Sequence, residues 1–124
     1  MSSLGAVLCF SRDPQLLESR RLVLLRAGFN VLTAVEFDAV RQFAESYKID
    51  LLIVGHTLDQ AQCEEAIHLA KAMNPPIKTL VLRYEGSSSP CAVGIADGEL
   101  DLTGGPEALI AKVKEMLAAP TRVA

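Results

Sequence analysis

Residues 6–14 read AVLCFSRDP, in which a continuous apolar run passes directly into the start of a helix. The apolar run covers residues 6–10 without alternation, as is typical of a strand that is covered on both faces of a parallel sheet. Asp13 is a helix-capping residue type and Pro14 suits the first helical position, so a helix is expected directly after the strand. A strand that leads straight into a helix is the repeating unit of α/β proteins.

The same pattern recurs along the chain. Further strands are expected at residues 31–34, 51–54, 77–82 and 100–102, and apolar residues at helical spacing follow each of them except the one at 77–82. After that strand, the breaker cluster at residues 85–90 and the weak apolar pattern at residues 91–97 predict a fourth helix that is short or absent. The pattern predicts a flavodoxin-like (βα)5 fold, a five-stranded parallel sheet with helices on both faces.

Length and composition are those of one globular domain. The chain has 124 residues, of which 50% are hydrophobic and 22% charged, a balance that excludes extensive disorder. We expect one domain over residues 1–124, with its core at about 6–118 and a flexible tail at 119–124. The net charge of −3 and the absence of a basic run argue against direct binding of nucleic acid.

The sequence also bears on cellular location. The longest apolar stretches fall far short of the roughly 18 residues that a membrane-spanning helix needs, and the N-terminus lacks the basic segment of a signal peptide. The three cysteines, Cys9, Cys63 and Cys91, are odd in number and widely spaced, which favours reduced thiols. We therefore expect a cytoplasmic protein with no membrane partner.

In the order and spacing of its elements, the chain resembles the receiver domain of bacterial two-component response regulators. The resemblance runs from about residue 6 to residue 118, and its best-matching stretches are residues 7–14, 26–31 and 50–54. It implies a flavodoxin-like fold and a place in phosphorelay signalling. In that family a histidine kinase donates a phosphoryl group to an aspartate at the end of the third strand, and acids after the first strand hold Mg²⁺.

The resemblance also locates the family's chemical positions, and the chain departs from them. The phosphoacceptor position falls on Gly55, which has no side chain to phosphorylate. The acidic pair after the first strand falls on Ser11 and Arg12, and Asp13 matches only the third, less essential position of that run. Because Mg²⁺ prefers several oxygen ligands and Asp13 alone is a poor cage, we expect no metal, no cofactor and no catalytic residues.

Three more residues complete the remnant of the crevice. The family's switch Ser/Thr falls on Arg83, and the lysine of its Lys-Pro pair falls on Gly105. His56 lies one residue beyond the phosphoacceptor position and is not expected to take its place. Positive charge from Arg12 and Arg83 opposes a bound cation.

These replacements lead to one main interpretation and two alternatives. We expect a degenerate, stand-alone receiver-like protein that is not an enzyme, is not phosphorylated, and acts through a protein partner or as a homodimer. An alternative is a cationic crevice at Ser11, Arg12 and Arg83 that binds an anion or a nucleotide. The competing structural explanation is that one arginine pairs with Asp13 and fills the space left by the metal.

A third interpretation makes His56 the acid–base group of an enzyme, although the sequence supplies no evident partner for it. For a protein interface, the outer face of the last helix around Lys112, Lys114 and Glu115 is the candidate. A solvated charged face explains those three residues equally simply.

Overall fold

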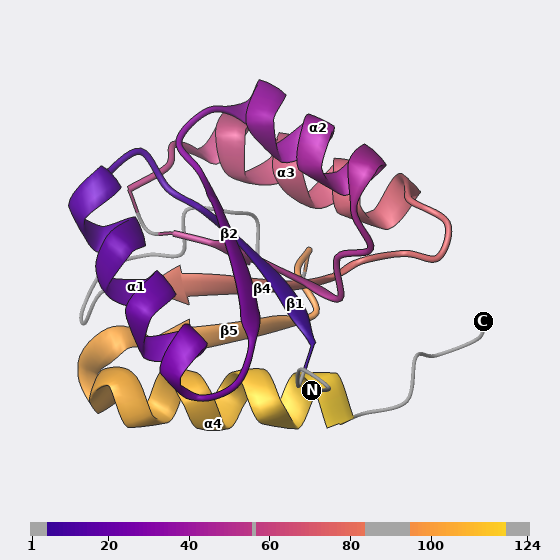
Figure 1. Cartoon of the computed structure of the whole chain (residues 1–124). Helices are drawn as coiled ribbons and strands as arrows, with labels where there is room; N and C mark the ends of the chain where they lie inside the picture. Colours follow the sequence, from indigo (N-terminus) through magenta and orange to yellow (C-terminus); the bar gives the residue numbers. More distant parts are fainter. Residues whose placement is uncertain (1–4, 56, 84–94, 119–124) are drawn as a thin grey trace.

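Five parallel strands form a single sheet in the order β2-β1-β3-β4-β5 (Figure 1). The computed structural model describes residues 5–55, 57–83 and 95–118. The strands are β1 (Ala6–Phe10), β2 (Asn30–Ala34), β3 (Leu51–Val54), β4 (Lys78–Arg83) and β5 (Gly98–Asp101). The predicted five-stranded parallel sheet is therefore confirmed, and its last strand begins two residues earlier than the sequence pattern indicates.

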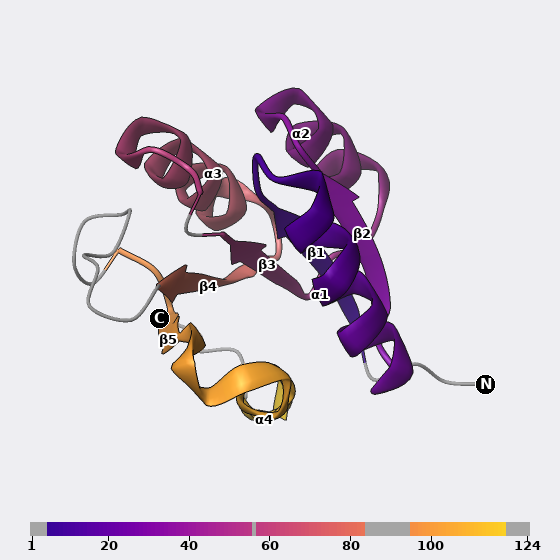
Figure 2. The same cartoon turned by 90° about the vertical axis from the view of Figure 1, so that its left-hand side faces the viewer.

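Helices cover both faces of the sheet, as predicted. Helices α2 and α3 lie side by side on one face, and α1 and α4 cover the other (Figures 1 and 2). Their bounds are α1 (Pro14–Arg26), α2 (Phe37–Ser46), α3 (Gln60–Ala72) and α4 (Gly105–Ala118), and a short 3-10 turn, η1 (Leu102–Gly104), precedes α4. None of the helices in the described ranges is long and apolar enough to cross a membrane.

The core consists of two apolar layers, one on each side of the sheet. All four residues of β3 are buried; Leu52 and Val54 pack with α2 and α3, while Leu51 and Ile53 pack with α1 and α4. This alternation explains why the strand sequences are continuously apolar, since successive side chains point to opposite and equally covered faces.

Two predicted features fall in parts of the chain that are not described. Of the segment between β4 and β5, only residues 95–97 are described, and they are not helical. The rest of the expected short or absent helix, at residues 84–94, lies outside the described residues, as does the expected tail at 119–124.

The cysteines differ from one another. Cys9 on β1 is a buried free thiol, which agrees with the sequence-based expectation. Cys63 on α3 is disulfide-bonded, so the prediction of a reduced thiol is wrong there. Cys91 lies outside the described residues.

Candidate functional site

The carboxyl ends of β1 and β3 place Ser11 and Gly55 side by side. The backbone N–H of Gly55 donates to the carbonyl of Phe10 at 2.8 Å, and the N–H of Ser11 donates to the carbonyl of Ala34 at 3.2 Å. These bonds extend the sheet ladder by one residue beyond each strand. In an open parallel sheet, this edge beside the central strands is where ligands usually bind.

A pair of hydroxyl groups joins the two loops at this edge. Ser11 Oγ lies 2.6 Å from Thr57 Oγ1, which also accepts a hydrogen bond from the Arg12 N–H at 3.1 Å. Ser11 Oγ accepts a further bond from the Asp13 N–H at 3.2 Å. The bonds satisfy the hydroxyl of Ser11, which is fully buried, and they tie the β1–α1 loop to the β3–α3 loop.

Gly55 is closely packed rather than open. A Cβ atom at this position would lie 2.9 Å from Nη1 of Arg20 and 3.0 Å from Cβ of Ser11, both shorter than ordinary van der Waals contact. Arg20 is buried, with 7% of its surface exposed. A Cβ atom at position 55 would therefore displace the flexible end of Arg20 and require Ser11 to shift by a few tenths of an ångström.

Sequence reasoning missed Arg20, although a signal was present. Arg20 lies three residues after Leu17 and four before Leu24, and the three are the buried residues of α1. An arginine on the apolar stripe of a helix is unusual because burial of its charge is costly. Its charge also acts on Cys9: burial raises the pKa of that thiol to about 12, and the positive charge of Arg20 offsets part of the rise.

Asp13 is engaged in capping a helix. Its Oδ1 accepts hydrogen bonds from the N–H groups of Gln15 at 3.0 Å and Leu16 at 3.4 Å. Neither Arg12 nor Arg83 forms a salt bridge with it in the described part of the chain. Within the same residues, no group of three or more His, Cys, Asp and Glu side chains is placed to hold a metal ion.

Arg83 and Asp101 end neighbouring strands and lie opposite each other in the β4–β5 register. Asp101 Oδ1 accepts hydrogen bonds from the N–H of Thr103 at 2.9 Å and from its Oγ1 at 2.8 Å. These two bonds lower the pKa of Asp101, and the charge of Arg83 lowers it further. The Nε of Arg83 is buried without a hydrogen-bond partner among the described residues.

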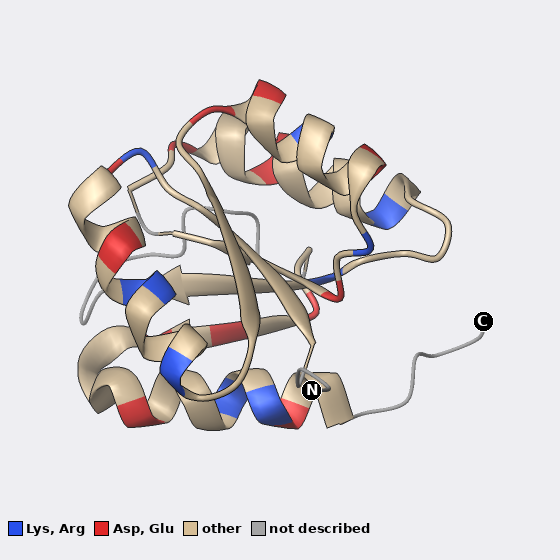
Figure 3. Ribbon diagram, in the orientation of Figure 1, with Lys and Arg blue, Asp and Glu red and all other residues tan. Residues whose placement is uncertain are grey.

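The remaining predicted positions are Gly105, His56 and the outer face of α4. Gly105, at the first turn of α4, has a φ of +74°, and nothing lies within 4 Å of where its Cβ would be. His56 lies outside the described residues. Helix α4 carries charges of both signs (Figure 3), and Lys112 pairs with Glu115 at 3.7 Å.

Several solved structures with the same fold are response regulators or their receiver domains. A putative response regulator from Chloroflexus aurantiacus J-10-fl is 21% identical, with a TM-score of 0.75 over 93% of this chain and 98% of that one. The chemotaxis response regulator CheY4 of Vibrio cholerae is 20% identical, with a TM-score of 0.74 over 90% of this chain and 98% of that one.

A receiver domain protein from the archaeon Methanospirillum hungatei JF-1 gives a TM-score of 0.74 at 14% identity, covering 92% of this chain and 94% of that one. No family model and no curated protein matches the sequence. The comparisons establish that the chain has the receiver fold, and the expected receiver-like architecture is confirmed.

Proposed function

We propose that the chain is a receiver-like signalling domain of the two-component lineage that is not phosphorylated at the receiver position and acts by binding a protein partner. The observation that carries the proposal is the packing of Gly55 against Arg20 and Ser11. An acyl phosphate can form only on a carboxylate, and position 55 is a glycine with the Arg20 guanidinium close beside it.

The electrostatics of the crevice support the same conclusion. Mg²⁺ in proteins is held by one or two carboxylates together with phosphate and water. Here the positions of the acidic pair carry a buried serine and an exposed arginine, and Asp13 is committed to the N-terminus of α1. The Arg20 guanidinium adds a positive charge beside Gly55, which repels a divalent cation.

A receiver fold that lacks phosphotransfer chemistry still has an outer surface that a protein partner can bind. Binding of a partner is therefore the function that we propose. The proposal includes the absence of enzymatic activity, because the Ser11 and Thr57 hydroxyls are hydrogen-bonded to each other and no base is placed to activate either among the described residues. A partner that recognises the domain is expected to bind it equally well with and without a phosphodonor.

The first experiment tests phosphorylation directly. We expect no change in intact mass or melting temperature after treatment with acetyl phosphate and Mg²⁺, while a receiver with an intact acceptor aspartate, treated in parallel, gains a phosphoryl group. A stable phosphoryl adduct on this chain would overturn the proposal.

The second experiment tests the binding role. Cross-linking of the tagged protein in cells, followed by reconstitution with purified candidates, is expected to give a specific partner or a homodimer whose affinity is unchanged by acetyl phosphate and Mg²⁺. A protein that remains monomeric in sedimentation and binds no candidate would contradict the binding role, whatever the phosphorylation result.

A second candidate function, an anion sensor, is favoured by one specific observation. The buried Nε of Arg83 lacks a hydrogen-bond partner among the described residues, and a guanidinium readily binds carboxylate or phosphate. If this site binds anions, inorganic phosphate will raise the melting temperature of the wild type by mass action and will not raise that of Arg83→Ala. An equal shift in Arg26→Ala, on the exposed end of α1, serves as the control.

The proposal keeps the cytoplasmic location expected from the sequence. A disulfide at Cys63 is uncommon in a reducing compartment, so location needs its own test. Cell fractionation is expected to recover the protein in the cytoplasmic fraction. Recovery in an extracytoplasmic fraction would contradict this location.

A further inference from the structure

A hollow of about 600 Å³ lies at the edge of the sheet opposite Gly55. It is bounded by the C-terminal ends of α2 and α3, the loop that enters β3, the first residue of β4, and Leu117 near the end of α4. Its volume is within the range of about 300–1,000 Å³ that is typical of ligand pockets. We call this hollow the amino-edge groove.

Part of the wall of the amino-edge groove is apolar. Ala44, Ile49 and Ile77 line it and are buried, and Met73 and Leu117 are partly buried beside them. Two cross-links fix the surrounding backbone: the N–H of Ala6 donates to Oδ2 of Asp50 at 2.8 Å, and Nζ of Lys78 donates to the carbonyl of Met116 at 2.7 Å.

The rim of the groove carries an aromatic ring, an amide and a cation. Tyr47 is 57% exposed, the highest exposure among the large apolar side chains of the described residues, and its ring packs against Phe43 with centroids 6.0 Å apart. Asn74 and Lys48 are exposed as well. An exposed tyrosine held at one edge is typical of the anchoring residues in protein interfaces.

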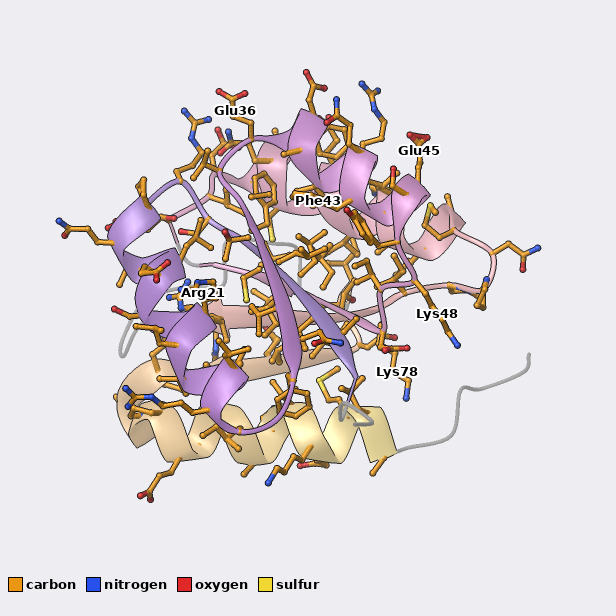
Figure 4. All side chains as sticks on the ribbon, viewed as in Figure 1. Arg21, Glu36, Phe43, Glu45, Lys48 and Lys78 are labelled. Atoms are coloured by element: carbon orange, nitrogen blue, oxygen red, sulfur yellow. The ribbon has the colours of Figure 1, made fainter. Side chains whose placement is uncertain are left out.

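The charges that line the groove are not equally available. Asp50 accepts the hydrogen bond from Ala6, and Lys78 is bonded to Met116. Glu45 extends away from Lys48 and Lys78, whose amino groups lie on the same side of the molecule (Figure 4). Lys48 forms no salt bridge within the described ranges, so it is an exposed cation with which a ligand can pair.

We propose that the amino-edge groove binds an extended segment of a partner protein in which a carboxylate stands beside apolar side chains. The inference rests on the proposed function, since it names the surface through which a partner is bound. The apolar wall takes the apolar side chains, Tyr47 packs over them, and Lys48 pairs with the carboxylate. Asn74 offers both an amide donor and a carbonyl acceptor, which suit the unpaired peptide groups of an extended chain.

The test selects ligands without assuming their sequence. A phage library of random octapeptides is selected on the wild-type protein, and the enriched peptide is synthesised with a fluorescent label for anisotropy titration. We expect a consensus of apolar residues next to Asp or Glu, bound at least about tenfold more weakly by Lys48→Glu, which corresponds to about 1.4 kcal/mol. Tyr47→Ser is expected to weaken binding similarly, and added salt to weaken it further.

A matched charge reversal serves as the control. Arg26→Glu changes an exposed cation at the end of α1, which does not line the groove, and is expected to leave the affinity within about twofold of the wild type. Lys48 is exposed, so the melting temperature of Lys48→Glu should stay close to that of the wild type.

Two outcomes would overturn the groove: a library that yields no enriched sequence, or a peptide that binds Lys48→Glu as tightly as the wild type. A partner identified by cross-linking that binds wild type and Lys48→Glu alike would exclude the groove and leave the proposed function standing. The absence of any partner would instead count against the proposed function.

Discussion

Arg20 changes what the crevice at the carboxyl edge can hold. A buried guanidinium is always charged and needs its positive charge balanced, so a neighbouring cation is disfavoured and a neighbouring anion is favoured. Because Nη1 lies against Gly55, the positive charge of Arg20 disfavours a bound Mg²⁺ at this position. A substitution of Gly55 alone therefore leaves the positive charge of Arg20 in the crevice.

The thiol of Cys9 gives a chemical readout of this packing. Its pKa is raised to about 12 by burial, even with Arg20 nearby, so almost no thiolate exists at pH 8. We expect the peptide that contains Cys9 to remain unmodified when the folded protein is incubated with iodoacetamide at pH 8, and to be alkylated fully in urea. The labelling is measured by peptide mass spectrometry. Rapid labelling of Cys9 in the folded protein would contradict this expectation, because it would show that the layer between the sheet and helices α1 and α4 opens to solvent.

The lowered pKa of Asp101 leads to a prediction of how the stability of the folded protein depends on pH. Its pKa is lowered in the folded state by the hydrogen bonds from Thr103 and by Arg83. A lowered carboxyl pKa contributes stability that is present above the unfolded value, about 3.9, and that is lost as the pH falls through the folded value. The melting temperature of Asp101→Asn should therefore lie below that of the wild type at pH 7, and the difference should shrink below about pH 4.

Glu99→Gln, on the exposed side of the same strand, is the comparison for this pH series. A gap between wild type and Asp101→Asn that stays constant from pH 7 to pH 3 would mean that the carboxylate charge of Asp101 plays no part.

At the start of α1, Asp13 acts as a cap and not as a metal ligand. Its carboxylate receives the N–H groups of Gln15 and Leu16, which have no partner within the helix. We expect Asp13→Ala to lower the free energy of unfolding by about 1 kcal/mol in urea denaturation, and Asp13→Ser to recover most of the loss. Addition of millimolar Mg²⁺ should leave all three melting curves unchanged; a rise confined to the wild type would restore a metal-binding role.

Regular strand–helix units were predictable because their burial is periodic and local. The residues 6–10 and 51–54 are strands at the predicted bounds, since continuous apolar runs bounded by polar turns have few other stable arrangements. The last strand was less predictable. Its sequence, Gly98–Asp101, is short and only partly buried, and its position is fixed by tertiary bonds such as that from the Thr79 N–H to Oδ2 of Asp97 at 2.8 Å.

The candidate site was predictable in position but not in composition. Spacing from the strands located Ser11, Gly55 and Arg83 at one edge of the sheet, as parallel topology requires. The hydroxyl bridge to Thr57 and the approach of Arg20 depend on side-chain packing between segments distant in the sequence, which periodicity does not encode. The amino-edge groove was missed for the same reason, because its lining comes from three separate stretches of the chain, residues 44–50, residues 73–78 and Leu117.

If the amino-edge groove binds a partner as proposed, the two edges of the sheet have exchanged their usual roles. The carboxyl edge, where α/β proteins bind ligands, is closed around Gly55 by hydrogen-bonded hydroxyls and a guanidinium. The opposite edge carries the hollow of about 600 Å³. A protein that communicates through the amino edge does not need the phosphorylation-dependent changes of the carboxyl edge.

If this division is correct, restoring the acceptor alone will not restore phosphorylation. In Gly55→Asp the new carboxylate would enter beside Arg20, whose flexible end can move, and beside Ser11 Cβ, which must give way by a few tenths of an ångström. We expect the carboxylate to pair with Arg20, the free energy of unfolding to fall by about 1–3 kcal/mol from overpacking, and the intact mass to stay unchanged after treatment with acetyl phosphate and Mg²⁺.

The combination Ser11→Asp, Arg12→Asp, Gly55→Asp and Arg20→Met is the companion variant, because it supplies the metal-binding acids and removes the competing cation. Phosphorylation of this combined variant, but not of Gly55→Asp alone, would show that the missing acids and the charges of Arg12 and Arg20 together prevent phosphorylation. If Gly55→Asp alone gains a phosphoryl group, Mg²⁺ must reach the crevice despite Arg20, and the electrostatic argument fails even though the fold stands.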